Sequence, residues 1–407
     1  MNQDIISGAN DPLKWRDEPL RVDTHRSGPF VFQIGVDPEA IRPLFDRVLD
    51  AHRRLLATPI LPDLARKLDR EVRISGIYGT NTIEGADLSR EETEIAFDAP
   101  PERAAAEAQQ RVANLKEAYA YVEEFGEKWT AQPFASPLLP IHEEDLKELH
   151  QLITQGLSDD PDNIPGQYRN NPKSRLTRVG DKAHGGVYTP PKCLADIERL
   201  VPQFLGWVST VSVQGRLMPL LRAPLVHYYV ERIHPFWDGN GRVGRCLESM
   251  ALRCAGYRFS AEALSNDYLE HLDEYYVAFR ASERAEEQKH PYPNTPFVTF
   301  FLESMLRTLN RLQDRVNELL RVVLFQNYIH TLLAQKKINA RQHTLLTLLL
   351  EKGEQPLDGL LFQPWYVALY RNRTARTRDR DLQGLAAQKL IELTGTGARR
   401  TIRPIFP

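Results

Sequence analysis

The stretch His234-Pro-Phe-Trp-Asp-Gly-Asn-Gly-Arg-Val-Gly-Arg245 lies between two segments with the apolar spacing of helices. Before it, apolar residues recur at every fourth position: Leu217, Leu221, Leu225, Tyr229 and Ile233. After it, helical spacing resumes at Val243, Cys246, Leu247, Met250, Ala251 and Cys254. Proline disfavours helical backbone in the residue before it, so Pro235 should end the first helix near His234. The pattern predicts a tight loop between two helices, in a mainly α core.

Several residues of this loop suit an anion. Gly239 and Gly241 can adopt positive φ, which lets successive backbone N–H groups point at one site and form an anion nest. The helix that begins near Gly241 adds the positive end of its dipole. Arg242 and Arg245 are three positions apart in the first turn of that helix, and each can bind a phosphate through its guanidinium.

Two further polar residues of the string, Asp238 and His234, are suited to catalysis. Asp238 lies at the rim of the predicted nest, where a carboxylate can hold Mg²⁺ bound to phosphates. Histidine exchanges its proton near neutral pH, so His234 is a candidate general base. A base, a metal carboxylate, an anion nest and two arginines together predict phosphoryl-linked group transfer.

The string has three other interpretations. The segment GNGRVG also matches the G-x-G-x-x-G pattern of dinucleotide-binding proteins, but that pattern needs a preceding strand and here a helix is expected. His227, His234 and Asp238 are metal-ligating residue types, but their spacing differs from H-E-x-x-H. A lone histidine at a helix end is usually structural. Twelve consecutive residues with so many constrained identities favour the transfer site instead.

The string resembles the signature of Fic proteins, H-P-F-x-[D/E]-G-N-G-R-x-x-R, and matches it at every fixed position. The resemblance implies a mainly α fold, with a Fic-type helical core, a β-hairpin flap and a C-terminal winged helix-turn-helix domain. It also implies a protein adenylyltransferase, in which the histidine deprotonates a Tyr, Thr or Ser hydroxyl of a target. That hydroxyl attacks the α-phosphate of ATP and releases pyrophosphate. ATP as substrate and Mg²⁺ are the implied cofactors.

The same resemblance assigns roles within the string. His234 is the implied base and Asp238 the implied Mg²⁺ ligand, while Asn240 and the amides of Gly239 and Gly241 hold the phosphates. Arg242 is implied to support the β-phosphate. Arg245 is implied to contact the γ-phosphate.

Three further segments resemble parts of the family. Thr80-Asn-Thr-Ile-Glu84-Gly85 is similar to the inhibitory motif [S/T]-x-x-x-E-[G/N], so Glu84 is predicted to be inhibitory. The alternative is a solvated glutamate near a helix end. The segment 186–191 resembles the flap that docks a target backbone by β-addition, here through Val187 and Tyr188; the alternative is an ordinary surface loop.

Tyr275 and Tyr276 resemble the tyrosine pair that lines the adenine side of the nucleotide site, and core packing is the alternative. The chain departs from the pattern just before this pair. Relatives often have Asn-Arg there, whereas this sequence has His271-Leu272. This departure leaves a nucleotide other than ATP as an alternative substrate.

The predicted organisation has four parts: an N-terminal arm (1–37), a helical region with the inhibitory motif (38–110), the Fic core (111–335) and the winged helix-turn-helix domain (336–407). Helical patterns cover 38–82, 101–126, 143–157 and 296–335, and 160–192 is predicted as loop. In the last domain, helical runs at 341–352 and 364–370 precede a basic segment and a predicted hairpin wing at 395–407.

Composition limits the remaining choices. The formal net charge is −2, with 42% hydrophobic and 26% charged residues, which is typical of a globular protein. No signal peptide or apolar membrane span is evident, and three cysteines without metal spacing favour a reducing, cytoplasmic location. The expected partner is a target protein with a modifiable hydroxyl. A homodimer and DNA binding by the C-terminal domain are left open as further interactions. Two alternative functions are also left open: removal of AMP or transfer of another phosphate-linked group, and a DNA-binding regulator with a sensor core.

Overall fold

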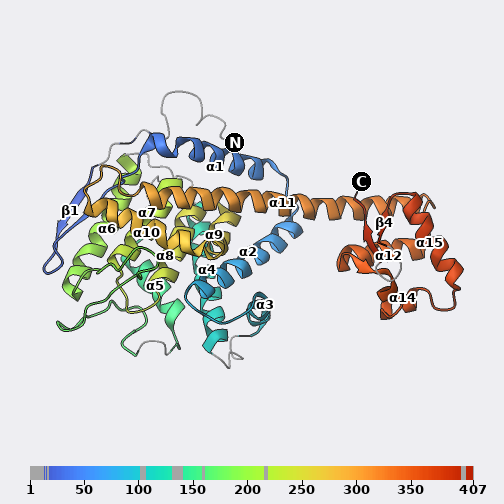
Figure 1. Ribbon diagram of the computed structural model, residues 1–407, viewed down its shortest axis with the longest axis horizontal. Coiled ribbons are helices and arrows are strands. Elements are labelled where there is room, and N and C mark those ends of the chain that lie inside the picture. Colours follow the sequence, from blue (N-terminus) through green and yellow to red (C-terminus); the bar gives the residue numbers. More distant parts are fainter. Residues whose placement is uncertain are drawn as a thin grey trace. The chain divides into compact units, whose positions relative to one another are not determined.

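The computed structural model describes residues 13, 15, 18–100, 107–130, 141–157, 161–214, 219–395 and 400–406 (Figure 1). Two compact units divide the chain at Gln313 and Asp314. The first unit contains most of the helices and two strands, and the second contains a smaller helical group with a three-stranded sheet. None of the helices in the described ranges is long and apolar enough to cross a membrane.

The predicted N-terminal arm contains a β-hairpin that the sequence analysis did not foresee. Strand β1 (Leu20–Asp23) pairs antiparallel with β2 (Pro29–Phe32). Alternate residues from Phe30 onward point inward, and Phe32 is fully buried against the rings of Trp207 and Tyr229. Four-residue strands give too short an alternation to be recognised in a Pro- and Gly-rich stretch. Residues 1–12, 14, 16 and 17 of the arm lie outside the described residues.

The predicted helical region of 38–82 forms two helices, α1 (Pro38–Ala57) and α2 (Pro62–Ile83). Asp37 caps the first, because its carboxylate accepts the N–H groups of Glu39 and Ala40. Helices α3 (Arg90–Asp98), α4 (Glu107–Thr130) and α5 (Glu143–Thr154) follow. Helix α4 covers most of the predicted run 101–126, whose first six residues lie outside the described part.

Helix α8 (Asn240–Cys254) lies at the centre of the first unit, where it packs against α4, α5, α7 (Pro219–Ile233) and α9 (Arg258–Glu270) (Figure 1). Buried residues occur all around α8, which is typical of a central helix. The predicted loop between two helices is confirmed as 234–239, between α7 and α8.

Helices α6 (Leu194–Gln214) and α10 (Leu272–Glu287), like α3 and α9, have no counterpart among the predicted elements. The long helix predicted at 296–335 is confirmed as α11 (Thr295–Ala334). Helix α2 lies very close to α9 at Gly76 and Gly79. A Cβ at either glycine would collide with the backbone of α9. This approach matters because the end of α2 carries Glu84.

The second unit contains α12 (Ala340–Lys352), α13 (Leu357–Leu360), α14 (Pro364–Leu369) and α15 (Ala375–Ala387). Its antiparallel sheet has the order β3 (Gln355–Pro356), β5 (Thr401–Pro404), β4 (Ile391–Thr394). The two helical runs predicted from sequence are therefore present. Strand β5 lies within the predicted wing (395–407), and β4 comes directly before it. Residues 396–399 between them lie outside the described residues.

Candidate active site

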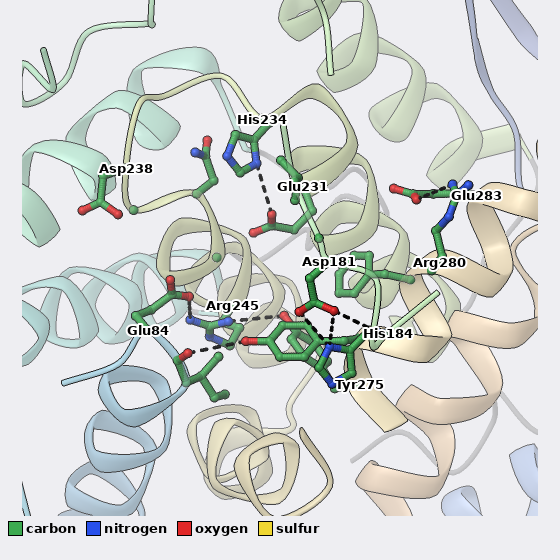
Figure 2. Close-up of a pocket in the computed structure, with 18 of the residues that line it drawn as sticks. Glu84, Asp181, His184, Glu231, His234, Asp238, Arg245, Tyr275, Arg280 and Glu283 are labelled. Carbon is green, nitrogen blue, oxygen red and sulfur yellow. Dashed lines mark hydrogen bonds and ion pairs between the residues drawn. The ribbon is translucent and has the colours of Figure 1, made fainter. Parts of the chain in front are cut away.

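A cavity of about 430 Å³ lies where the end of α2, the loop 179–186, the loop 234–239 and helices α7, α8 and α10 meet (Figure 2). Glu84, His234, Asp238 and Arg245 are among the residues that line it. The structure thus brings together side chains that are far apart in sequence. Tyr275, Tyr276, Gly239, Asn240 and Gly241, which were also predicted as site residues, line the same cavity.

The loop 234–239 has unusual backbone angles at both ends. His234 has φ 48°, which is uncommon for a residue with a side chain, and Gly239 has φ 80° as the N-cap of α8. The Asn240 side chain fixes the loop, because its Oδ1 accepts the Phe236 N–H and its Nδ2 donates to the Phe236 carbonyl, both at 2.9 Å. Both ends of the Asn240 amide are therefore engaged within the protein. The backbone N–H of Asn240 is the group left for its predicted contact with phosphates.

Arg169, which no sequence motif identified, supports the loop through hydrogen bonds to backbone carbonyls. Its Nε donates to the His234 carbonyl at 2.6 Å, and its Nη2 donates to the carbonyls of Pro191 at 2.7 Å and Ile233 at 3.5 Å. Its side chain also contacts Asn171, and the residue is fully buried. Burial lowers the pKa of the Arg169 guanidinium to about 10, so the group stays protonated at neutral pH. This buried cation holds the strained His234 backbone in place.

We expect Arg169→Ala to lower the free energy of unfolding by roughly 3 kcal/mol or more, because several buried carbonyls would lose their donor at once. Urea unfolding followed by circular dichroism measures this change. Arg178→Ala, which alters an exposed arginine nearby, is the matched control and should change stability little. An equal effect of both substitutions would contradict the supporting role of Arg169.

His150 supports the loop from its other side. Its ring stacks on Phe236 with centroids 3.7 Å apart and planes 2° apart. The Gly166 N–H donates to His150 Nδ1 at 2.9 Å, so the ring proton is on Nε2, which donates to the Asp238 carbonyl at 3.1 Å. Burial lowers the pKa of His150 to about 4. His150 is therefore a neutral, structural histidine.

The predicted base, His234, lines the cavity and lies beside a carboxylate. Glu231, one turn earlier on α7, has its Oε2 3.4 Å from His234 Nδ1 (Figure 2). Burial raises the pKa of the Glu231 carboxyl, but interactions with His234, His227 and Arg245 lower it overall. An ionised Glu231 favours a proton on Nδ1 and leaves His234 Nε2 free to accept one.

Arg245 is held on three sides by groups from other elements. Its Nη2 pairs with Glu84 Oε1 at 2.5 Å, its Nε donates to Thr80 Oγ1 at 2.7 Å, and its Nη1 donates to the Tyr275 hydroxyl at 3.2 Å. The arginine is 2% exposed, whereas the Glu84 side chain is 26% exposed. Gly241 leaves room for this pair, since a Cβ there would collide with Glu84 Oε1. The Glu84 carboxylate thus lies over the first turn of α8.

Arg242 has a different neighbourhood from the one predicted. Its side chain is 1% exposed, and its Nη2 binds Oδ2 of Asp238, in the loop just before α8, at 2.5 Å. It is absent from the described lining of the cavity. In this structure, Arg242 orients the Asp238 carboxylate, and its contact with the β-phosphate stays a prediction.

The segment 179–188 forms a short hairpin at the edge of the cavity. Val179 and Tyr188 form an antiparallel bridge, with N–H···O distances of 2.9 and 2.8 Å. The Tyr188 hydroxyl donates to the Arg232 carbonyl at 3.0 Å, and the neighbouring Val187 is 45% exposed. Both residues of the predicted flap lie beside the cavity but are not among its lining.

The structure argues against the dinucleotide-binding and metal-binding interpretations of the motif. A helix, α7, precedes the glycine-rich segment, so the strand that a dinucleotide fold needs is missing from that position. His227 is buried and contacts Glu248 and Tyr275 instead of joining His234 and Asp238. Among the described residues, the Asp267, Glu270 and His271 group has metal-ligating side chains close together, but Arg307 and Arg311 already bind Asp267.

Residues 140–252 match the model of the Fic/DOC family. This segment includes α5, the flap hairpin, the loop 234–239 and most of α8. The chain contains a Fic domain. The string at 234–245 is therefore the signature of that domain, as the sequence resemblance implied.

Curated relatives support the Fic domain at modest identity. A protein adenylyltransferase Fic of Nematostella vectensis is 26% identical over 239 residues, covering 57% of this chain and 50% of the relative. A protein of the same name from Drosophila willistoni is 33% identical over 119 residues, covering 29% of this chain and 21% of the relative. The chain spans about half or less of these relatives.

Solved structures agree with the Fic fold. A Fic family protein from Desulfovibrio desulfuricans has a TM-score of 0.51 and 21% identity, with 90% of this chain and 96% of that one covered. A Fic domain containing signaling protein from Bacteroides thetaiotaomicron has a TM-score of 0.50 and 21% identity, covering 68% of this chain and 96% of the other. The mainly α fold with a Fic core is thus confirmed.

Proposed function

We propose that this protein transfers AMP from ATP to a hydroxyl group of a target protein and that Glu84 restrains the reaction. One observation carries the proposal: His234, the start of α8 and the Glu84–Arg245 pair line a single cavity. The curated relatives from Nematostella and Drosophila are named protein adenylyltransferases, which favours AMP as the transferred group.

The geometry suits the following step. His234 Nε2 takes the proton of a Tyr, Thr or Ser hydroxyl, and the hydroxyl oxygen bonds to the α-phosphorus of ATP. The bond from that phosphorus to the bridging oxygen breaks, and pyrophosphate leaves with the electron pair. The N–H groups at the start of α8 and the guanidinium of Arg245 bind the phosphates, aided by the helix dipole. The exposed Val187 edge is where we place the target strand.

The residues fit Mg²⁺. Among the described contacts, only one oxygen of Asp238 is engaged, by Arg242, and its side chain is 29% exposed at the cavity. One carboxylate together with substrate phosphates is a usual protein environment for Mg²⁺. Bound there, the metal would neutralise charge on the leaving pyrophosphate.

ATP labelled with ³²P at either the α- or the γ-phosphate tests the transferred group. The Glu84→Gly variant should acquire label on protein from α-labelled ATP and none from γ-labelled ATP. Label on protein from γ-labelled ATP alone would show that the protein transfers a phosphate group and not AMP. Release of AMP from a modified target, without transfer, would favour AMP removal instead.

Asp238→Ala should abolish the response of transfer to Mg²⁺ and lower the rate at least ~10²-fold, because the charge on pyrophosphate would be left unneutralised. Transfer measured across a series of Mg²⁺ concentrations checks this result. Asp181→Asn is the matched control, since Asp181 lines the same cavity but is bound to His184. If Asp238→Ala responds to Mg²⁺ as the parent does, another residue holds the metal.

A second candidate function, DNA binding, is favoured by the charge of the C-terminal unit. Residues 314–407 contain 15 Lys and Arg against eight Asp and Glu, in a chain whose net charge is −2. At and before the start of α15, Arg371, Arg373, Arg376 and Arg380 are exposed and have no acidic partner among the described side chains. Exposed, unpaired arginines on and beside one helix suit DNA phosphates.

In the full-length protein, replacing Arg373, Arg376 and Arg380 by Ala should weaken duplex DNA binding more than ~10-fold at 0.1 M salt and reduce the salt slope by about 3. Fluorescence anisotropy with a labelled duplex measures both quantities. Arg403→Ala is the control, because Arg403 is already paired with Glu392 at 2.5 Å. Absence of salt-dependent binding by the parent protein would exclude this candidate function.

A further inference from the structure

A chain of side-chain hydrogen bonds runs from Arg245 into the core behind the cavity. Arg245 Nη1 lies 3.2 Å from the Tyr275 hydroxyl, which lies 3.0 Å from His227 Nε2. His227 Nδ1 lies 3.0 Å from Glu248 Oε2, and the Tyr268 hydroxyl donates to Glu248 Oε1 at 2.8 Å. All five residues are at most 2% exposed. We refer to this set as the relay.

Donors and acceptors fix the direction of the relay. Arg245 can only donate, so the Tyr275 oxygen accepts from it and the Tyr275 proton goes to His227 Nε2. Burial raises the pKa of Tyr275 well above its usual value, so the hydroxyl keeps this proton. His227 Nε2 is then an acceptor, the ring proton is on Nδ1, and Nδ1 donates to the Glu248 carboxylate. Every polar atom in these contacts is satisfied by this single arrangement.

The relay restricts how Arg245 can turn. Thr80 holds its Nε at 2.7 Å, and Tyr275 holds its Nη1. Glu84 binds only Nη2, which also donates to the Thr80 carbonyl at 3.5 Å. Displacement of Glu84 would therefore free one N–H of Nη2, while the contacts to Thr80 and Tyr275 stay in place. A guanidinium that is already oriented loses less entropy when a phosphate oxygen binds.

We propose that His227 and Glu248 are positioning residues that hold the Tyr275 hydroxyl, and through it the Arg245 guanidinium, in the orientation that receives the terminal phosphate of the nucleotide. The inference rests on the proposed function in one respect, because Arg245 is taken as the ligand of that phosphate. His227 and Glu248 do not touch the cavity, so their influence on nucleotide binding passes through Tyr275.

The ratio of ATP affinity to ADP affinity tests this inference, since only ATP presents the terminal phosphate. Isothermal titration uses the full chain carrying Glu84→Gly and His234→Ala, so that the site is open and ATP is not consumed by transfer. Adding Tyr275→Phe should lower ATP affinity about three- to tenfold, the value of one lost hydrogen bond, with little change for ADP. Glu248→Gln, which keeps the size of the side chain, should act in the same direction with a smaller effect.

Tyr228→Phe is the matched control. Its hydroxyl is also buried and also accepts from an arginine Nη1, that of Arg232, at 3.2 Å, but neither residue lines the cavity. This variant should keep the ATP to ADP ratio of the parent.

Equal losses for ATP and ADP, or no loss, in both Tyr275→Phe and Glu248→Gln would overturn the inference and leave the relay as core packing. If Tyr275→Phe fails to fold, Glu248→Gln alone decides the question. The binding ratio does not depend on transfer. A protein that distinguishes ATP from ADP through the relay but transfers no AMP with His234 intact would therefore refute the proposed function and not this inference.

Discussion

His234→Ala should abolish AMP transfer while ATP affinity stays within a few-fold of the parent. The phosphates are expected to contact the start of α8 and Arg245, and removal of the imidazole changes neither of these contacts. What is lost is the acceptor for the hydroxyl proton, and removal of a general base lowers rates by ~10²–10⁴-fold. Transfer in the Glu84→Gly background, measured beside ATP binding by titration, separates the two effects.

His184→Ala is the control for this experiment. His184 is a second histidine in the cavity wall, but its Nδ1 faces Asp181 and its Nε2 faces Asp273, so neither nitrogen is available to a hydroxyl. Its loss should lower the rate far less. Activity of His234→Ala within a few-fold of the parent would show that another group removes the proton.

Local features of this molecule could be predicted from sequence. The loop 234–239 is one of them, because Pro235 disfavours continuation of the first helix, Gly239 permits a positive φ, and the apolar spacing on both sides predicts the helices. The long helix α11 follows from the same regular spacing. The N-terminal hairpin was missed because its strands have only four residues each.

Contacts between distant segments could not be derived in that way. Glu84 and Arg245 are 161 positions apart, and the family resemblance implied a role for each of them without a contact between them. Arg169 holds a carbonyl 65 positions away, and its place in the sequence gives no sign of this role. Such partners are chosen by how helices pack, for example by the close approach of α2 to α9 at Gly76 and Gly79.

Side-chain direction was the other limit. The motif predicted phosphate contacts for Asn240 and Arg242, but it did not indicate that their side chains bind Phe236 and Asp238. Two residues of one helical turn face different neighbours, so membership in a motif does not determine which of them faces the cavity. Glu231 illustrates the converse, since no motif includes it and the helical turn still places it beside His234.

Glu84→Gly should increase self-modification from α-labelled ATP by ~10²-fold, because a misplacement of ~1 Å can cost that much in rate. The Glu84 carboxylate binds Arg245 Nη2 at 2.5 Å, and this is the nitrogen that we propose for the γ-phosphate. With that position taken, ATP can still bind through its inner phosphates, but its α-phosphorus is not aligned with the incoming hydroxyl. Wild-type protein should therefore bind ATP and transfer little.

The loss of Glu84 also leaves Arg245 as a buried cation without a bonded carboxylate. Removing one partner of a buried pair is destabilising, so Glu84→Gly should unfold at a lower temperature, and ATP should raise that temperature more than it does for the wild type. Adding Arg245→Ala should cancel both the gain in transfer and the added protection by ATP, since each depends on the freed guanidinium. Labelling of Glu84→Gly at the wild-type level would show that Glu84 only pairs with a structural arginine and does not inhibit transfer.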